Sequence, residues 1–262
     1  MIRPLFRYPG SKSKIINQLY AKILLNKNNN YVEPFFGTGV VGWNLLKNFR
    51  SFTFNDKDND IYLLWYAIHT DADYLKELIL SFTPSTESYK YFLDCLEKQS
   101  LSNTETAFMK LTIHQMSYSG LGTLAGPIGG WRQLGDYGIG CRYNTKLLCN
   151  KIDQYHKLIL DNKITFSNLD FSEIKYINDC YVYLDPPYFK NSHQLYEIHF
   201  NNEDHIRLCN FLHSSKFQWL LSYDDCSEIR NMYDWANISE ISFNYTLNSF
   251  TNDRRTELLI CP

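Results

Sequence analysis

The fold is indicated most clearly by residues 31–60, YVEPFFGTGVVGWNLLKNFRSFTFNDKDND. A compact apolar run from Tyr31 to Phe36 is typical of a buried strand, and Gly37-Thr38-Gly39 ends it in a tight loop. Residues 40–49 continue with helical potential, and residues 51–55 then alternate like a second strand before a polar, aspartate-rich turn. Two strands around one helix make the first βαβ unit of a doubly wound sheet, so the segment predicts an α/β fold.

The spacing of apolar residues divides the rest of the chain into a helical part and a part where strands and helices alternate. From residue 61 to 161, apolar residues recur at helical intervals, as at Leu75, Leu78, Ile79 and Phe82, and a glycine-rich stretch at 120–140 interrupts them. Afterwards the α/β rhythm returns, with strands expected at 164–166, 180–184, 217–222 and 257–261 and a helix opening at Asn202. We therefore expect an α/β domain built from residues 1–60 and 162–262, with a mostly helical insertion at 61–161.

Composition limits the classes of protein that this chain can represent. Its 262 residues, 44% of them apolar, suffice for one large domain or for a core domain with an insertion. The formal net charge of −2 gives no global basic field, but no acid precedes Glu33, whereas six Lys and Arg do. A second basic excess lies between residues 121 and 160. Such runs allow nucleic-acid binding, although solvated faces produce them too.

The sequence lacks the patterns of a disulfide-bonded, metal-binding or membrane-spanning protein. The seven Cys contain no C-x-x-C pair, which indicates free thiols in a reducing compartment and not a disulfide framework or a zinc site. No apolar run approaches the ~20 residues of a membrane span, and the N-terminus lacks a signal-peptide stretch. Asp56, Asp58 and Asp60 fail the calcium-loop pattern at Ile61 and Ala67. We expect a cytoplasmic protein without a metal or a membrane anchor.

The segment with the strongest chemical signal is Asp185-Pro186-Pro187-Tyr188, directly after the expected strand 180–184. Open α/β sheets bind ligands at the carboxyl ends of their strands. Both prolines lack an N–H donor, so the turn presents carbonyl oxygens and one carboxylate as a rigid set of acceptors. Acceptors for the N–H groups of an adenine N6 amino group favour a pyramidal nitrogen whose lone pair can attack a methyl donor. Tyr188 is placed to stack on the base.

The loop at Gly37, Gly39 and Gly42 matches G-x-G-x-x-G, which taken alone would indicate a dinucleotide and a dehydrogenase. Glycines let a backbone approach many kinds of ligand at a helix N-terminus. The acid that ends the next strand, Asp56, comes only 14 residues after Gly42, and no dehydrogenase needs the Asp-Pro-Pro-Tyr turn. S-adenosylmethionine fits better, with its methionine part on the loop and its ribose hydroxyls on Asp56.

Taken in order, the segments R-Y-P-G-S-K (7–12), V-E-P-F-F-G-T-G (32–39), N-D (55–56) and D-P-P-Y (185–188) resemble the Dam-type, D12-class DNA N6-adenine methyltransferases. The resemblance extends from Phe6 to Ile260. It implies a Rossmann-like, S-adenosylmethionine-dependent methyltransferase core with an inserted, mostly helical target-recognition domain. It also implies site-specific methylation of double-stranded DNA by in-line displacement after base flipping. A cognate restriction endonuclease is a partner that such an enzyme can have.

The resemblance assigns roles position by position. It assigns the catalytic turn to Asp185, Pro186 and Tyr188. The cofactor contacts that it implies are Tyr8, Lys12, Phe35, Phe36, Gly37, Gly39, Asp56, Asp170, Phe171 and Asp185. Tyr8 stands where many relatives have Trp. Residues 115–121, Q-M-S-Y-S-G-L, resemble the family's recognition segment R-x-G-Y-N-G-L, and the departures from it, such as Ser119 in place of Asn, concern the target sequence and not the reaction.

DNA contacts are expected in the insertion, at Tyr118, Ser119, Arg132, Arg142 and Asn144. In a groove, Arg reads guanine and Asn reads adenine. Contact of the two arginines with phosphates alone stays open as an alternative. Rival substrates for the same turn are cytosine N4, an RNA adenine and a glutamine amide in proteins, although the last usually has Asn in place of Asp185. A DNA-binding module without catalytic activity is the alternative of a different class.

Overall fold

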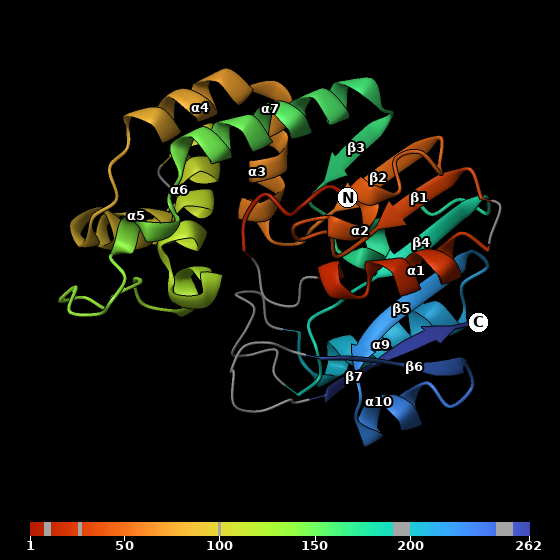
Figure 1. Ribbon diagram of the computed structural model, residues 1–262. Helices are drawn as coiled ribbons and strands as arrows, with labels where there is room; N and C mark the ends of the chain where they lie inside the picture. Colours follow the sequence, from red (N-terminus) through yellow and green to blue (C-terminus); the bar gives the residue numbers. More distant parts are fainter. Residues whose placement is uncertain (8–11, 26–27, 99–100, 191–199, 245–253) are drawn as a thin grey trace.

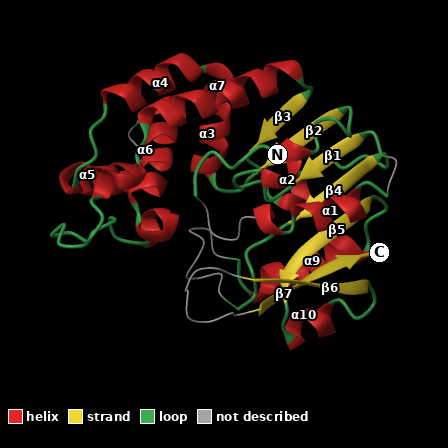
Figure 2. Ribbon diagram, in the orientation of Figure 1, coloured by secondary structure: helices red, strands yellow, loops and turns green. Residues whose placement is uncertain are grey.

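The structure is a computed structural model that describes residues 1–7, 12–25, 28–98, 101–190, 200–244 and 254–262. A seven-stranded sheet runs through it in the order β3-β2-β1-β4-β5-β7-β6 (Figures 1 and 2). The strands are β1 (Asn30–Glu33), β2 (Ser51–Asn55), β3 (Ile164–Ser167), β4 (Cys180–Leu184), β5 (Gln218–Asp224), β6 (Asn237–Asn244) and β7 (Arg254–Cys261). The pairs β3-β2, β2-β1, β1-β4 and β4-β5 are parallel, whereas β7 is antiparallel to both β5 and β6. The predicted α/β fold is confirmed.

All six expected strands exist; those at 51–55 and 180–184 have the expected bounds, and the bounds of the other four differ. The first strand ends at Glu33 and not at Phe36, because Pro34 has no N–H to donate to a neighbouring strand. The helix after it ends at Asn44, well before Phe49. Strand β6 was not predicted. It pairs with β7 alone among the described strands, and its sequence NISEISFN has too little apolar alternation to mark it as an edge strand.

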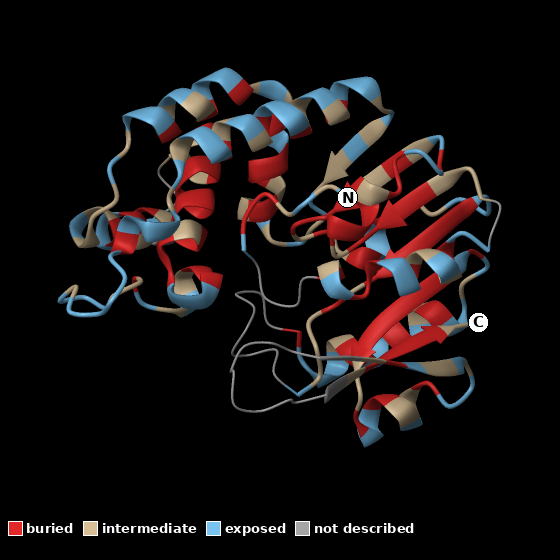
Figure 3. Ribbon diagram, viewed as in Figure 1, coloured by how far each residue is buried: buried red, intermediate tan, exposed pale blue. Residues whose placement is uncertain are grey.

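Side chains of the central strand β4 alternate between the two faces of the sheet. Tyr181 and Tyr183 join the core beneath α1 (Ile16–Ile23) and α2 (Val40–Asn44), whereas Val182 and Leu184 join the core beneath α9 (Asn202–His213) and α10 (Ser227–Met232). Figure 3 shows the buried interior of the sheet between these helices. Both faces are therefore covered, as the continuous apolar sequence of this strand requires.

A helical part lies beside the sheet, next to β3 (Figure 1). It contains α3 (Asn59–Thr70), α4 (Ala72–Ser81), α5 (Thr86–Lys98), α6 (Asn103–Met116) and α7 (Thr145–Asp161), with short 3-10 turns between α6 and α7. Helix α6 packs against α3, α4 and α5. The ring centroids of Trp65 on α3 and Tyr155 on α7 lie 5.1 and 5.0 Å from that of Trp43 on α2. One continuous apolar core therefore joins the helical part to the sheet.

Polar side chains set where several helices begin. Asp58 caps α3 by accepting hydrogen bonds from the amides of Asp60 and Ile61, and Ser102 and Glu105 form a reciprocal capping box at α6. Asn144 caps α7 through the amide of Leu147. No helix in the described part of the chain is long and apolar enough to cross a membrane.

The strand order places a crevice in the sheet. Proceeding outward, β1 is followed by β2 and β3 on one side, whereas β4 is followed by β5 on the other. The connections after β1 and β4 therefore diverge, and ligands bind at such a switch point, outside the carboxyl ends of the strands. The glycine loop 37–39 follows β1, and Asp185 follows β4.

Candidate active site

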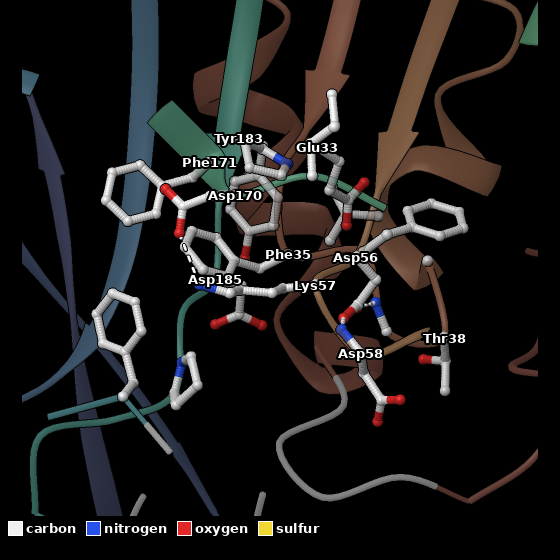
Figure 4. Close-up of a pocket in the computed structure, with 18 of the residues that line it drawn as sticks. Glu33, Phe35, Thr38, Asp56, Lys57, Asp58, Asp170, Phe171, Tyr183 and Asp185 are labelled. Carbon is white, nitrogen blue, oxygen red and sulfur yellow. Dashed lines mark hydrogen bonds and ion pairs between the residues drawn. The ribbon is translucent and has the colours of Figure 1, made fainter. Parts of the chain in front are cut away.

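A cleft opens at this switch point (Figure 4). Its walls come from the loops after β1, β2, β3 and β4 and from α9. The lining residues are Lys12, Glu33, Pro34, Phe35, Phe36, Gly37, Thr38, Gly39, Val40, Val41, Asp56, Lys57, Asp58, Leu169, Asp170, Phe171, Tyr183, Asp185, Pro187, Phe200, Asp204 and Arg207. Nine of the residues assigned to the cofactor from the sequence therefore lie around one cavity. The tenth, Tyr8, lies outside the described residues.

The glycine loop is held from both sides. Gly37 and Gly39 have φ of 49° and 64°, in the left-handed region that glycine adopts without strain. A Cβ on Gly39 would come within 2.1 Å of the Phe36 ring. The Gly37 amide donates to Asp56 Oδ2 at 2.6 Å, and Trp65 Nε1 donates to the Gly37 carbonyl at 2.8 Å. Trp65 was not predicted from the sequence to support this loop.

Asp56 is half-buried at the end of β2 and lines the cleft. Its second oxygen accepts the amide of Asp58 at 2.9 Å. Burial, followed by the neighbouring Asp58 carboxylate, raises the pKa of Asp56 to about 7. Each of its oxygens accepts one hydrogen bond from a backbone amide, which leaves a second lone pair on each. The carboxylate can thus accept a ligand hydroxyl while it anchors the loop.

Glu33 is an acid of the cleft that the sequence reasoning did not assign. Its side chain is buried and accepts the Tyr31 hydroxyl at 2.9 Å. Burial raises the pKa of Glu33 well above its ordinary value, and the nearby Asp185 adds to this effect. The sequence did contain a signal for Glu33. Glu33-Pro34 lies at the end of β1 much as Asp185-Pro186 follows β4, and β1 and β4 are neighbouring parallel strands.

Lys12 and Asp185 form a buried ion pair at the centre of the site. Lys12 lies in a 3-10 turn (Lys12–Lys14), is only 3% exposed, and places Nζ 2.7 Å from Asp185 Oδ1 and 4.0 Å from Glu257 Oε2. Burial raises the pKa of Asp185 to about 6, against the lowering effect of the Lys12 ammonium. Above that pH, Asp185 is a carboxylate with hydrogen-bond acceptors at the cleft.

The turn after Asp185 is anchored from β5. Pro186 is buried, Pro187 lines the cleft, and the ring centroid of the half-buried Tyr188 lies 4.8 Å from Lys12 Nζ. Asp224, at the end of β5, accepts the amide of Phe189 at 2.9 Å and that of Lys190 at 3.1 Å. Because both amides directly follow Tyr188, Asp224 fixes the exit of the turn. It was not assigned from the sequence.

Asp170 and Phe171 lie on the other side of the cleft, after β3. Asn55 positions this loop, since its amide donates to the carbonyls of Pro34 and Leu169 at 2.9 and 3.0 Å. The rings of Phe171 and Phe35 lie 5.9 Å apart. An aromatic wall and a carboxylate therefore stand together here, both from residues that the resemblance assigns to the cofactor.

The residues expected to contact DNA lie in the helical part, and none of the five lines the cleft. Tyr118, Ser119, Arg132 and Arg142 are exposed, and Ser119 has a left-handed φ of 55°. Asn144 is exposed too, and its side-chain oxygen accepts the Leu147 amide at 2.9 Å as the cap of α7. The structure thus shows a structural role for Asn144, whose capping oxygen is already engaged.

Comparison with known proteins identifies the family. The model of the D12 class N6 adenine-specific DNA methyltransferases matches residues 8–247. The Type II methyltransferase M.MjaIII of Methanocaldococcus jannaschii is 24% identical over 237 residues, which cover 80% of this chain and 79% of that protein. The Type II methyltransferase M.CviBI of Paramecium bursaria Chlorella virus NC1A is 22% identical, with coverage of 89% and 87%.

Among solved structures, a putative RNA methyltransferase, PH1948 from Pyrococcus horikoshii, aligns with a TM-score of 0.44 at 10% identity, over 98% of this chain and 84% of that one. A likeness this distant adds nothing to the assignment. The family match, in contrast, includes the glycine loop, the acid that ends β2 and the turn after β4. This chain belongs to the D12 class of N6 adenine-specific DNA methyltransferases.

Proposed function

We propose that this enzyme takes the methyl group from S-adenosylmethionine and transfers it by direct in-line displacement to the N6 of an adenine flipped out of double-stranded DNA. The observation that carries the proposal is the position of Asp185. Its carboxylate lies beside the glycine loop, at the switch point of the sheet, in a turn whose two prolines offer no competing N–H donors.

The chemistry of the cleft fits this cofactor. Six acidic side chains line it (Glu33, Asp56, Asp58, Asp170, Asp185, Asp204), against three basic ones (Lys12, Lys57, Arg207). The excess of carboxyl groups supplies hydrogen-bond acceptors for the ammonium group and the ribose hydroxyls of this cofactor, whereas the pyrophosphate of a dinucleotide needs donors. The Gly37 amide, which a phosphate would need, already donates to Asp56. When bound, S-adenosylmethionine supplies an electrophilic methyl group. Glu33 and the loop would hold its methionine part, Asp56 its ribose, and Asp170 with Phe171 its adenine.

Asp185 and its turn would orient the nucleophile. The ionised carboxylate and the Pro186 carbonyl would accept the two hydrogens of the adenine amino group and so direct the nitrogen lone pair at the methyl donor. As the N–C bond forms and the S–C bond breaks, one of these hydrogens would leave as a proton, to Asp185 or to water. The Tyr188 ring stacks on the base and sets its plane. Lys12 keeps Asp185 ionised near neutral pH, because its ammonium opposes the effect of burial on the carboxyl pKa. The base must leave the duplex first, since its N6 is otherwise paired.

The helical part is proposed to recognise the DNA sequence. Its exposed Tyr118, Ser119, Arg132 and Arg142 lie on the connections between α6 and α7 and can reach a partner without unfolding. Because both curated relatives are named Type II methyltransferases, we include a restriction endonuclease with the same recognition sequence as a proposed partner.

The reaction is tested by digesting DNA to nucleosides after incubation with the enzyme and labelled S-adenosylmethionine, followed by mass spectrometry. We expect N6-methyladenine from duplex DNA with the wild type. Asp185→Ala should lose more than 100-fold in kcat, or roughly 3 kcal/mol of transition-state stabilisation, while the fold is retained. N4-methylcytosine, or methylation of RNA in place of DNA, would contradict the proposed substrate. A variant that retained a tenth of kcat would contradict the role of Asp185.

A further inference from the structure

Arg207 reaches into the cleft from α9 and had no role in the sequence analysis. Its Nη1 and Nη2 donate to Asp170 Oδ1 and Oδ2 at 2.8 and 2.9 Å. Nη2 also donates to Asp204 Oδ1 at 3.0 Å, one turn earlier on the same helix. The guanidinium carbon lies 4.6 Å from the centre of the Phe171 ring. One side chain therefore holds both members of the Asp170-Phe171 pair.

The effect of Arg207 on Asp170 is both electrostatic and geometric. Burial alone would raise the pKa of Asp170, but hydrogen bonds from Arg207, Lys57 and Ser172 outweigh it and hold that pKa well below its ordinary value. Two parallel bonds from a planar guanidinium also fix the plane of the carboxylate, which a lysine would not do. Asp170 is thus kept ionised and in one orientation.

Asp170 has no acceptor capacity left in this arrangement. Arg207 supplies two hydrogen bonds, the Ser172 amide and hydroxyl two more at 3.1 and 2.7 Å, and Lys57 Nζ a fifth at 2.8 Å. A carboxylate offers about four lone-pair positions. A ligand that donates to Asp170 must therefore replace one of the present donors.

Lys57 is the donor that can leave. Its side chain is 55% exposed, whereas that of Asp170 is 12% exposed. It extends from the loop after β2 across the cleft to Asp170 (Figure 4). An exposed lysine contributes little to an ion pair, and its flexible stem lets it move aside. Arg207, held by three hydrogen bonds and by the Phe171 ring, stays in place.

We propose that Arg207 is a positioning residue that makes this end of the cleft selective for an adenine base in the cofactor. Arg207 orients Asp170 so that the exocyclic amino group of the base takes the place of Lys57 as a donor, and it sets the plane of Phe171 against which the base packs. The inference rests on the proposed use of S-adenosylmethionine.

The test compares two ligands that differ in the base alone. S-adenosylhomocysteine has a 6-amino group that donates to Asp170, whereas S-inosylhomocysteine has a 6-oxo group that cannot. Calorimetric titration of the full chain should show that the wild type prefers the adenine compound at least ~10-fold, as expected when a charged acceptor loses its hydrogen bond. Arg207→Met should reduce that ratio to less than ~3-fold, and Arg207→Lys should fall between the two.

Two variants serve as controls. Arg230 on α10 forms a similar forked ion pair with Asp225, away from the cleft, so Arg230→Met should keep the wild-type ratio. Lys57→Met should bind the adenine compound at least as tightly as the wild type does, because a competing donor is gone. Thermal unfolding without ligand verifies that each variant is folded.

The outcomes distinguish a wrong cofactor from a wrong role of Arg207. If the wild type binds neither compound, the proposed cofactor is wrong. If it binds both with equal affinity, or if folded Arg207→Met keeps the wild-type preference, the role of Arg207 is refuted while the cofactor stands. A loss of 10-fold or more in affinity for the adenine compound in Lys57→Met would show that Lys57 is a ligand and would also overturn the proposed exchange of donors.

Discussion

Replacing Lys12 by methionine removes the ammonium that lies 2.7 Å from Asp185 Oδ1 and leaves a methyl-ended chain of similar length in its place. Removing one partner of a buried ion pair costs about 3–5 kcal/mol, because the other charge stays buried without compensation. The Asp185 side chain is 21% exposed, so water reduces this penalty, and Glu257 is at 4.0 Å from the same ammonium. We therefore expect a loss of about 3 kcal/mol, which corresponds to roughly 6–12 °C in Tm for a chain of this size.

The stability lost in Lys12→Met should depend on pH, and the titration of Asp185 determines whether it grows or shrinks as the pH falls. Its pKa in the folded protein is about 6, above that of an unfolded aspartate, and without Lys12 it should rise further. The folded variant takes up a proton as the pH falls, which stabilises it relative to the unfolded chain. Urea unfolding should therefore show the full loss near pH 8 and a smaller one near pH 5.

A second variant separates the charge effect from a packing defect. In Lys12→Met/Asp185→Asn the unpaired carboxylate is gone, and stability near pH 8 should return to within about 1 kcal/mol of the wild type. The exposed Lys146 on α7 provides a control, since Lys146→Met should change stability by less than about 0.5 kcal/mol. A loss below 1 kcal/mol for Lys12→Met, a loss that does not vary with pH, or a double variant less stable than the single one would contradict a stabilising charge interaction between Lys12 and Asp185.

Three further predictions concern the cofactor, the target base and the DNA. The affinity for S-adenosylhomocysteine should fall as the pH drops below about 7, because protonated Asp56 no longer offers two ionised acceptor oxygens, and Asp56→Asn should flatten this dependence in calorimetric titrations. Asp224→Ala should lower kcat about 10-fold without changing the cofactor Kd, since the anchor of the two amides after Tyr188 is lost. Asp225→Ala, which breaks the ion pair of Asp225 with Arg230 of α10, should leave kcat unchanged in the same assay. In methylation of a randomised duplex pool, Arg132→Ala or Arg142→Ala should relax the preference at one base if the arginine reads a base. If the arginine contacts a phosphate, methylation of all sequences should fall by the same factor, and the affinity for DNA should depend less steeply on salt concentration. A variant with unchanged rate and unchanged sequence preference would exclude both contacts.

Local sequence determined the features that depend on neighbours along the chain. The βαβ unit, the strand before Asp185 and the start of α9 at Asn202 follow from apolar alternation, from glycine and proline, and from polar residues at helix starts. Because parallel strands end at a common edge, these patterns already placed the glycine loop, Asp56 and Asp185 on one side of the sheet. Glu33 could have been predicted as a residue of the site in the same way, since it also ends a buried strand before a proline.

The tertiary structure decided which partners those residues have. Nothing near Lys12 in the sequence indicates that it forms an ion pair with Asp185, and nothing near Arg207 indicates that it forms one with Asp170. These contacts arise when β4 and α9 are brought next to segments far away in the chain, and their free energy depends on burial, which periodicity does not report. Asn144 shows the converse, because the oxygen of an amide that was expected to contact DNA also caps α7. A residue type in a sequence specifies which hydrogen bonds are available, and only the folded surroundings decide which of them are made.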